Sequence, residues 1–186
     1  MSPTRPRDAT SAYGLTLRPI AATMPGVPTT YEDTAEAFIR MAHRTVWATV
    51  ATVEPDGRPR SRILHPIWEW AGDELVGWVA TTKTRPKVDA LDGQPAVSVT
   101  YWSPSHDTCS AECLATWADD AVTRHRTWHL FADGPQPVGY DPRIIPGWDS
   151  PDTPAFCVLR LEPYRLRVFP GTVLLGEGGD VLRWKR

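Results

Sequence analysis

The sequence predicts a mainly β protein of the α+β class, built as an antiparallel barrel with flanking helices. Three observations support this prediction. Runs of β-branched and apolar residues at 46–53, 74–80 and 96–102 are typical of strands. The turn Glu54–Gly57 joins the first run to an alternating stretch at 58–70. Only one short helical pattern separates the last two runs, so the chain forms a meander, which favours an antiparallel barrel over a parallel sheet.

The chain has 186 residues, which suits a single domain with a substantial core. Residues 1–28 are rich in Pro, Thr, Arg and Ala without a sustained period, so we expect an N-terminal arm there and one domain over 29–186. Thr30 and Asp33 form a capping-box pattern. Apolar residues at helical spacing follow, and we expect the helix to end near His43 and Arg44.

The second half of the chain predicts a weaker strand at 110–117 and a helix capped by Asp119 or Asp120. A long loop rich in Pro and Gly follows at 133–154, and its length suggests a lid over the site. Two strands that pair with each other are expected at 155–161 and 164–169. A glycine-rich turn at 176–180 then leads into a last short strand at 181–184.

Composition argues against several classes of protein. The net charge is −2, with 20 Lys and Arg against 22 Asp and Glu, so nothing favours nucleic acid or an acidic membrane surface as a partner. No apolar run approaches the roughly 18 residues of a membrane helix. Three cysteines cannot all pair within one chain, and no secretory segment opens the sequence, so we expect a reduced, cytoplasmic protein.

The stretch at 80–91 carries the strongest chemical signal. Two hydroxyls, Thr81 and Thr82, end an apolar strand, and three cations, Lys83, Arg85 and Lys87, follow within five residues at the start of a short helix. Hydroxyl donors, clustered cations and free helix N–H groups suit a phosphate. The alternative is a solvated basic loop after an edge strand.

Two other patterns in the sequence are possible sites. Cys109, Cys113, His125 and His129 approach zinc-finger spacing, but the acidic intervening stretch and a short final spacer favour no metal, with the cysteines acting as small apolar residues. His65 follows the basic stripe of Arg58, Arg60 and Arg62, and a lone histidine beside proline on a strand is more often structural than catalytic.

Residues 31–102 resemble the pyridoxamine 5′-phosphate oxidase-like split-barrel flavoproteins of the type common in actinobacteria, with looser similarity to about residue 169. The resemblance rests on an ordered series of segments rather than on one motif. These are the first helix, Trp47–Val50, Asp56–Leu64, Thr81–Lys87 with Leu91, and Gln94–Val99.

The resemblance implies a split β-barrel that binds FMN at a homodimer interface. Arg62, Ile63 and Leu64 match the strand beside the cofactor, Thr81 matches a phosphate-binding hydroxyl, and Lys87 matches a phosphate-binding lysine. The family's serine and arginine before that lysine are replaced by Arg85 and Pro86. The full set of expected cofactor-binding residues is Arg60, Arg62, Ile63, Leu64, Thr81, Thr82, Lys83, Arg85 and Lys87.

The implied function is FMN-dependent oxidation or reduction of a small organic substrate, with hydride transfer at the flavin N5. Residues that would hold a pyridoxine phosphate substrate have no clear match, and Trp184 and Arg186 are vague candidates. One alternative is an oxidoreductase of the same fold that uses the deazaflavin F420. Another is a flavin- or haem-binding carrier or sensor without turnover.

Overall fold

The computed structural model describes residues 30–186, so the expected arm at 1–28 lies outside the described residues. The helices are α1 (Tyr31–Thr45), α2 (Arg85–Gly93), α3 (Ala121–Ala132) and α4 (Gly171–Leu174), with a 3₁₀ turn at Pro142–Ile144. The strands are β1 (Ala48–Val53), β2 (Pro59–Leu64), β3 (Pro66–Ala71), β4 (Glu74–Thr81), β5 (Ala96–Trp102), β6 (Thr108–Trp117), β7 (Cys157–Phe169) and β8 (Leu182–Lys185).

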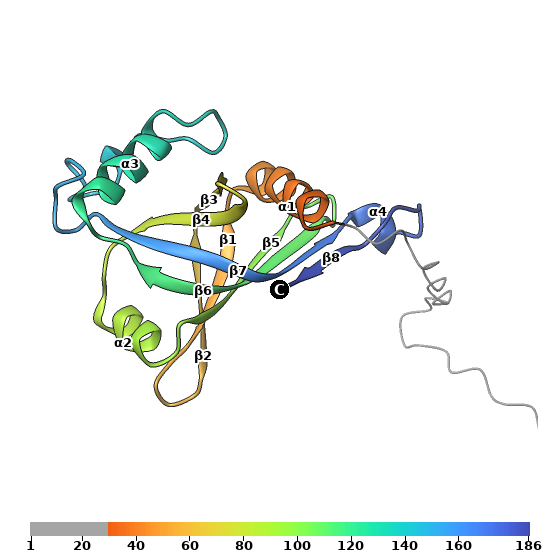
Figure 1. The fold of residues 1–186 in the computed structure, drawn as a ribbon, viewed down its shortest axis with the longest axis horizontal. Coiled ribbons are helices and arrows are strands. Elements are labelled where there is room, and N and C mark those ends of the chain that lie inside the picture. The colour runs from red at the N-terminus through yellow and green to blue at the C-terminus, as the bar shows by residue number, and fades with distance from the viewer. Residues whose placement is uncertain (1–29) are drawn as a thin grey trace, which may run out of the picture.

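All eight strands join one antiparallel sheet, as expected from the meander. Seven follow the order β2-β1-β5-β6-β7-β4-β3, and β8 pairs with the second half of β7 (Figure 1). The strands β2 and β3 stand at opposite ends of this order, although only His65 separates them in the chain. The sheet therefore curls round on itself, which gives a barrel.

The helices occupy different sides of the barrel. Helix α1 begins with the expected capping box, in which Thr30 accepts from the Asp33 amide at 3.1 Å. It places Phe38 and Met41 in the main core, together with residues of β1, β3, β5, β6 and β7. Helix α3 covers the other face of β4 and β7, where a second core forms around Trp78, Trp128 and Phe156. Helix α2 lies apart from both at the lower end of the barrel (Figure 1).

The alternating stretch at 58–70 forms two strands rather than one. Its alternation is preserved, since Leu64 and Trp68 pack in the main core while Ile67 packs against Phe131 of α3. The break falls at His65 because β2 pairs with β1, whereas β3 pairs with β4. Pro66 lacks an N–H and constrains the residue before it, so it suits the start of the second strand.

The strands expected at 155–161 and 164–169 do not pair with each other. They are the two halves of β7, one strand of 13 residues. Pro163 lies at the point where the register with β6 shifts, between Glu112 and Cys113. A bulge tolerates proline inside a strand, so Glu162-Pro163 does not make a turn. Strand β6 is also longer than expected, because it pairs with both β5 and β7.

The other expected elements are present, and α4 is an addition. Strand β5, helix α2 and the Asp120-capped helix α3 fall where the sequence predicts them. No helix within residues 30–186 is long and apolar enough to cross a membrane.

Trp68 lies at the centre of the main core. Its indole N–H donates to the Tyr101 hydroxyl at 2.8 Å, and Phe38 meets its ring edge-on. Its backbone N–H donates to His43 Nε2 at 3.0 Å. Gly77 is its direct cross-strand partner, and a Cβ added there would come within 2.8–3.0 Å of the indole carbons. The indole therefore fills the space that a side chain at position 77 would occupy.

We predict that Gly77→Ala lowers the free energy of unfolding by about 1–3 kcal/mol, the usual cost of overpacking a core. The Trp68 ring cannot move aside without losing its bond to Tyr101. Urea denaturation followed by tryptophan fluorescence measures the change. Gly93→Ala is the matched control, because a Cβ there meets nothing within 4 Å and the residue ends a helix. Equal stability of both variants would contradict this account.

His65, at the corner between β2 and β3, is buried among aromatic rings. It stacks on Tyr140 with ring centroids 5.3 Å apart and meets Phe131 edge-on. Its Nε2 has no hydrogen-bond partner among the described residues. Burial, helped by the charge of His43, lowers the pKa of His65 to about 4. The imidazole is therefore neutral in the folded protein near pH 7.

We predict that the protein loses stability as the pH falls from about 6.5 to about 4. Over this window the unfolded chain protonates His65 while the folded protein does not, so protons favour unfolding. The loss should reach about 2–3 kcal/mol, and His65→Leu should remove it. Urea denaturation at several pH values measures the slope. The burial-lowered pKa of His43 contributes to the slope of both proteins, so the difference between them isolates His65.

Candidate phosphate and cofactor site

Three of the expected cofactor residues meet at the end of the barrel beside α2. Thr81 ends β4 with its side chain on the inner face, and Lys87 reaches back to it from the first turn of α2. The Lys87 ammonium donates to Thr81 Oγ1 at 2.5 Å and to the Thr82 carbonyl at 2.9 Å. Arg62 of β2 lies near enough for its charge to act on Lys87. Two distant strands and a helix thus converge on one point.

Lys87 is a buried cation without a carboxylate. Only 7% of the residue is exposed, and no Asp or Glu within residues 30–186 forms an ion pair with it. Burial, and next the positive charge of Arg62, lower the pKa of Lys87. An anion placed beside the ammonium would reverse both penalties. The local electrostatics therefore favour a negatively charged ligand here.

Arg62 is oriented by the hairpin that carries it. Its guanidinium donates to Thr52 Oγ1 at 2.7 Å and to Glu54 Oε1 at 3.3 Å. Glu54 also lies 3.7 Å from Arg60, which is half exposed. Because Glu54 already compensates the two arginines, their net contribution toward an anion is smaller than their number suggests. Lys87 supplies the uncompensated charge of the site.

The other residues of the motif point in different directions. Lys83 forms an ion pair with Asp119 and lies over the Trp117 ring. Arg85 is almost fully exposed, 3.6 Å from Asp89. Thr82 donates to the Ala155 carbonyl at 3.0 Å and faces the 133–156 loop rather than Lys87. The three cations that are close in sequence therefore do not form one cluster.

Ile63 and Leu64 lie on opposite faces of β2. Leu64 packs against the main core. Ile63 is 63% exposed on the outer face of the sheet. Neither residue is among the hydrogen-bond partners of the Lys87 ammonium, so the structure does not bring these two expected residues to the Thr81–Lys87 site.

Sequence reasoning missed Thr52, Glu54 and Cys157. Cys157 pairs with Thr81 across β4 and β7 and lies beside Lys87. The turn at Glu54–Gly57 predicts that Thr52 and Arg60 face each other, and this could have placed Thr52 near Arg62. No local signal could have placed Cys157 at the site, because its cross-strand partner Thr81 is 76 positions earlier in the chain.

The loop at 133–156 is tied to α3 and to the segment between β4 and α2. Trp148 donates to Thr82 Oγ1 at 3.2 Å, and Arg124 donates to the Thr153 carbonyl. His125 contacts Asp152 at 2.8 Å. The loop thus borders the Thr81–Lys87 site through Thr82, and its role as a lid stays a prediction.

The four residues with zinc-like spacing fall into two separate environments. Cys109 and Cys113 lie buried in the main core on the inner face of β6. His125 and His129 lie on α3 and contact Asp152 and Asp133. Within residues 30–186, no group of three or more His, Cys, Asp or Glu side chains is arranged to hold a metal ion.

The fold is that of several solved structures. One is a protein related to general stress protein 26 of Bacillus subtilis, of the pyridoxinephosphate oxidase family, from Clostridium acetobutylicum. It aligns with a TM-score of 0.62 at 11% identity over 84% of this chain and 96% of the other. A pyridoxamine 5′-phosphate oxidase-related, FMN-binding protein from Nostoc punctiforme aligns at 0.58, with 21% identity over 85% and 91%.

A haem-binding protein from Mycobacterium smegmatis also aligns, with a TM-score of 0.54 and 17% identity. The alignment covers 84% of this chain and 60% of that one. No protein-family model matches the sequence, and no curated protein matches it. The likeness to the solved structures confirms the predicted architecture: the chain has the antiparallel split-barrel fold of pyridoxamine 5′-phosphate oxidase-related proteins.

Proposed function

We propose that this protein binds FMN, holding its phosphate at Lys87, Thr81 and Arg62. The buried Lys87 ammonium carries this proposal, because it lacks a carboxylate and already donates to the neighbouring hydroxyl and carbonyl. A phosphate oxygen accepts hydrogen bonds from an ammonium, a hydroxyl and a guanidinium. The positive end of the α2 dipole, where Thr84 makes no side-chain cap, also favours an anion near the start of this helix.

The proposed activity is an FMN-dependent oxidoreduction of a small organic substrate in the cytoplasm. FMN supplies the hydride chemistry, so the protein needs no catalytic triad. The protein's part is to hold the phosphate, to orient the ring and to limit access of water. A solved structure with the same fold is described as FMN-binding, which supports this choice of cofactor.

The protein is proposed to act as a homodimer through the outer face of β2, β1 and β5. Three large apolar side chains are exposed there: Ile63 at 63%, and Trp102 and Trp47 at 60% each. The register places Ile63 and Trp102 on the face opposite the main core, and Trp47 directly precedes β1. Contiguous exposed apolar residues of this size are typical of subunit interfaces.

We predict that Lys87→Met weakens FMN binding about 10- to 100-fold, because a hydrogen bond to a charged group is worth about 1.5–3 kcal/mol. Riboflavin, which lacks the phosphate, should bind both proteins equally. Absorbance and fluorescence titrations measure the two affinities. The free energy of unfolding of the unliganded protein should change by less than about 1 kcal/mol, since the variant removes a buried charge along with its hydrogen bonds.

The matched control is Arg40→Met, which removes an exposed cation of α1 that pairs with Glu36. Equal loss of riboflavin and FMN binding in the Lys87 variant would show that phosphate is not the group recognised. The same titrations with F420 and with haem separate the alternatives. Tight binding of either, without FMN retention, would contradict the choice of cofactor.

We predict that the wild-type protein sediments at about twice the 20.7 kDa of one chain and that Ile63→Glu shifts it to the mass of one chain. A charge within an apolar interface must be desolvated without a partner, which opposes association. Val122→Glu is the matched control, because Val122 is 79% exposed on α3, away from this face. A monomeric wild-type protein, or dissociation by both variants, would contradict the proposed interface.

A further inference from the structure

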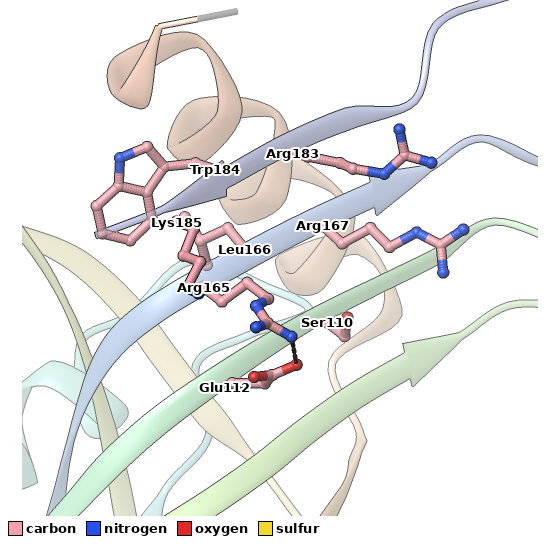
Figure 2. A pocket seen from close by; sticks show the side chains of 8 residues that line it. All are labelled: Ser110, Glu112, Arg165, Leu166, Arg167, Arg183, Trp184 and Lys185. Carbon is pink, nitrogen blue, oxygen red and sulfur yellow. Dashed lines mark hydrogen bonds and ion pairs between the residues drawn. The ribbon is translucent and has the colours of Figure 1, made fainter. Parts of the chain in front are cut away.

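Four cations form a compact block on the outer face of the sheet, where β7 pairs with β8. Arg165 pairs with Lys185 in the register, and Arg167 pairs with Arg183. All four side chains are exposed and line one depression of about 620 Å³, together with Ser110 and Glu112 of β6 (Figure 2). Each cation thus faces a like charge directly across the ladder, an arrangement that costs stability.

The block is poorly compensated. In residues 30–186, five Lys or Arg side chains have no carboxylate within ion-pair distance: Lys87, Arg124, Arg167, Arg183 and Lys185. Three of the five lie in this block. The single carboxylate of the depression, Glu112, is held by Arg165 at 2.9 Å (Figure 2). The sequence has more acidic than basic residues, so there are enough carboxylates to pair with these cations. The fold places those carboxylates elsewhere.

The block is separate from the Lys87 site. Thr81 pairs with Cys157 at the start of β7, whereas Arg165 lies eight residues further along the same strand. Eight residues of extended chain span roughly 25 Å. Thr81 of the Lys87 site is buried on the inner face of the sheet, while the block lies on the outer face. One compact ligand cannot reach both.

The dimensions of the block indicate the size of its ligand. Cross-strand partners lie about 5 Å apart, and alternate residues along a strand lie about 6.6 Å apart. The Cα atoms of the four cations therefore outline a rectangle of roughly 5 by 7 Å. The charges of a diphosphate or triphosphate group are spaced on this scale. A nucleic acid would need a longer stripe, since proteins that bind duplexes commonly contact 6–10 phosphates.

We propose that this block binds the diphosphate or triphosphate group of a small molecule. Arg167 and Arg183 present guanidinium forks, which match phosphate oxygens in pairs, and Lys185 adds a compact charge. Ser110 on β6 pairs with Arg167 on β7, so its hydroxyl is a further donor. Arg165 already forms an ion pair with Glu112, so the phosphate group is expected to lie nearer to Arg167 and Arg183. Bound phosphate also relieves the repulsion between the paired cations.

The test is isothermal titration of the full chain with inorganic tripolyphosphate, after saturation with FMN so that the Lys87 site is filled. Lys87→Met serves as a second background if FMN does not bind. We expect one tripolyphosphate per chain, with affinity that falls steeply between 50 and 200 mM salt. The double variant Arg167→Gln/Arg183→Gln should weaken binding about 100-fold or more. The control Arg40→Gln/Arg58→Gln removes two exposed cations elsewhere and should bind as the wild type does.

The free double variant should be at least as stable to urea as the wild type, because neutral side chains remove the cross-strand repulsion. A loss of stability with unchanged binding would make the block structural and overturn the proposal. Absence of tripolyphosphate binding, or equal binding by both double variants, would do the same. So would tighter binding of a 20-nucleotide single strand than of tripolyphosphate.

The source of the phosphate chain is distinguished by a parallel titration with ATP. Affinity above that of tripolyphosphate, lost in the same double variant, would assign the block to a nucleotide. Equal affinity would show that the phosphate chain alone is recognised. Both results support a site for a small polyphosphate.

Discussion

The structure depends on the way in which Trp68 fills the space left by Gly77. The indole ring lies directly across the ladder from a residue without a side chain, and its N–H is satisfied by Tyr101. Through Phe38 and the His43 acceptor it also fixes helix α1. One side chain thus joins β3, β4, β5 and α1. Because β3 and β5 lie on different sides of the strand order, this contact runs across the barrel interior and sets how tightly the sheet can curl.

The curl of the sheet decides which charges meet. Arg62 lies on β2 and Thr81 on β4, strands that are far apart in the hydrogen-bonded order. They come together because the His65 corner joins β2 to β3, the neighbour of β4. Helix α2 then returns Lys87 to the same end. Arg62 arrives with its own carboxylate, Glu54, whereas Lys87 arrives without one. The site therefore combines one pre-oriented guanidinium with one cation that still needs an anion, and this supports the proposed binding of a phosphate.

Local patterns predicted most elements and part of the site. The capping box, the strands from 46 to 102 and the pairing of Thr81 with Lys87 on one strand-to-helix junction follow from residues close in sequence. The sequence did not predict that Lys83 and Arg85 point away from Lys87. Lys83 pairs with Asp119, which is 36 positions away in the chain, and Arg85 is exposed to solvent. The continuity of β7 through Pro163 was also hidden, since a bulge depends on the partner strand β6. The position of Cys157 opposite Thr81 could be known only from the register between β4 and β7.

The reactivity of the buried cysteines can report how often the folded protein opens locally. Cys109, Cys113 and Cys157 are all buried and unpaired, and burial raises the pKa of Cys109 and Cys113 well above that of a free thiol. The first two project inward from β6, which is flanked by β5 and β7. An alkylating reagent reaches these two thiols only when the middle of the sheet separates. Their rate of modification in the native protein therefore reports the frequency of that separation, without an introduced label.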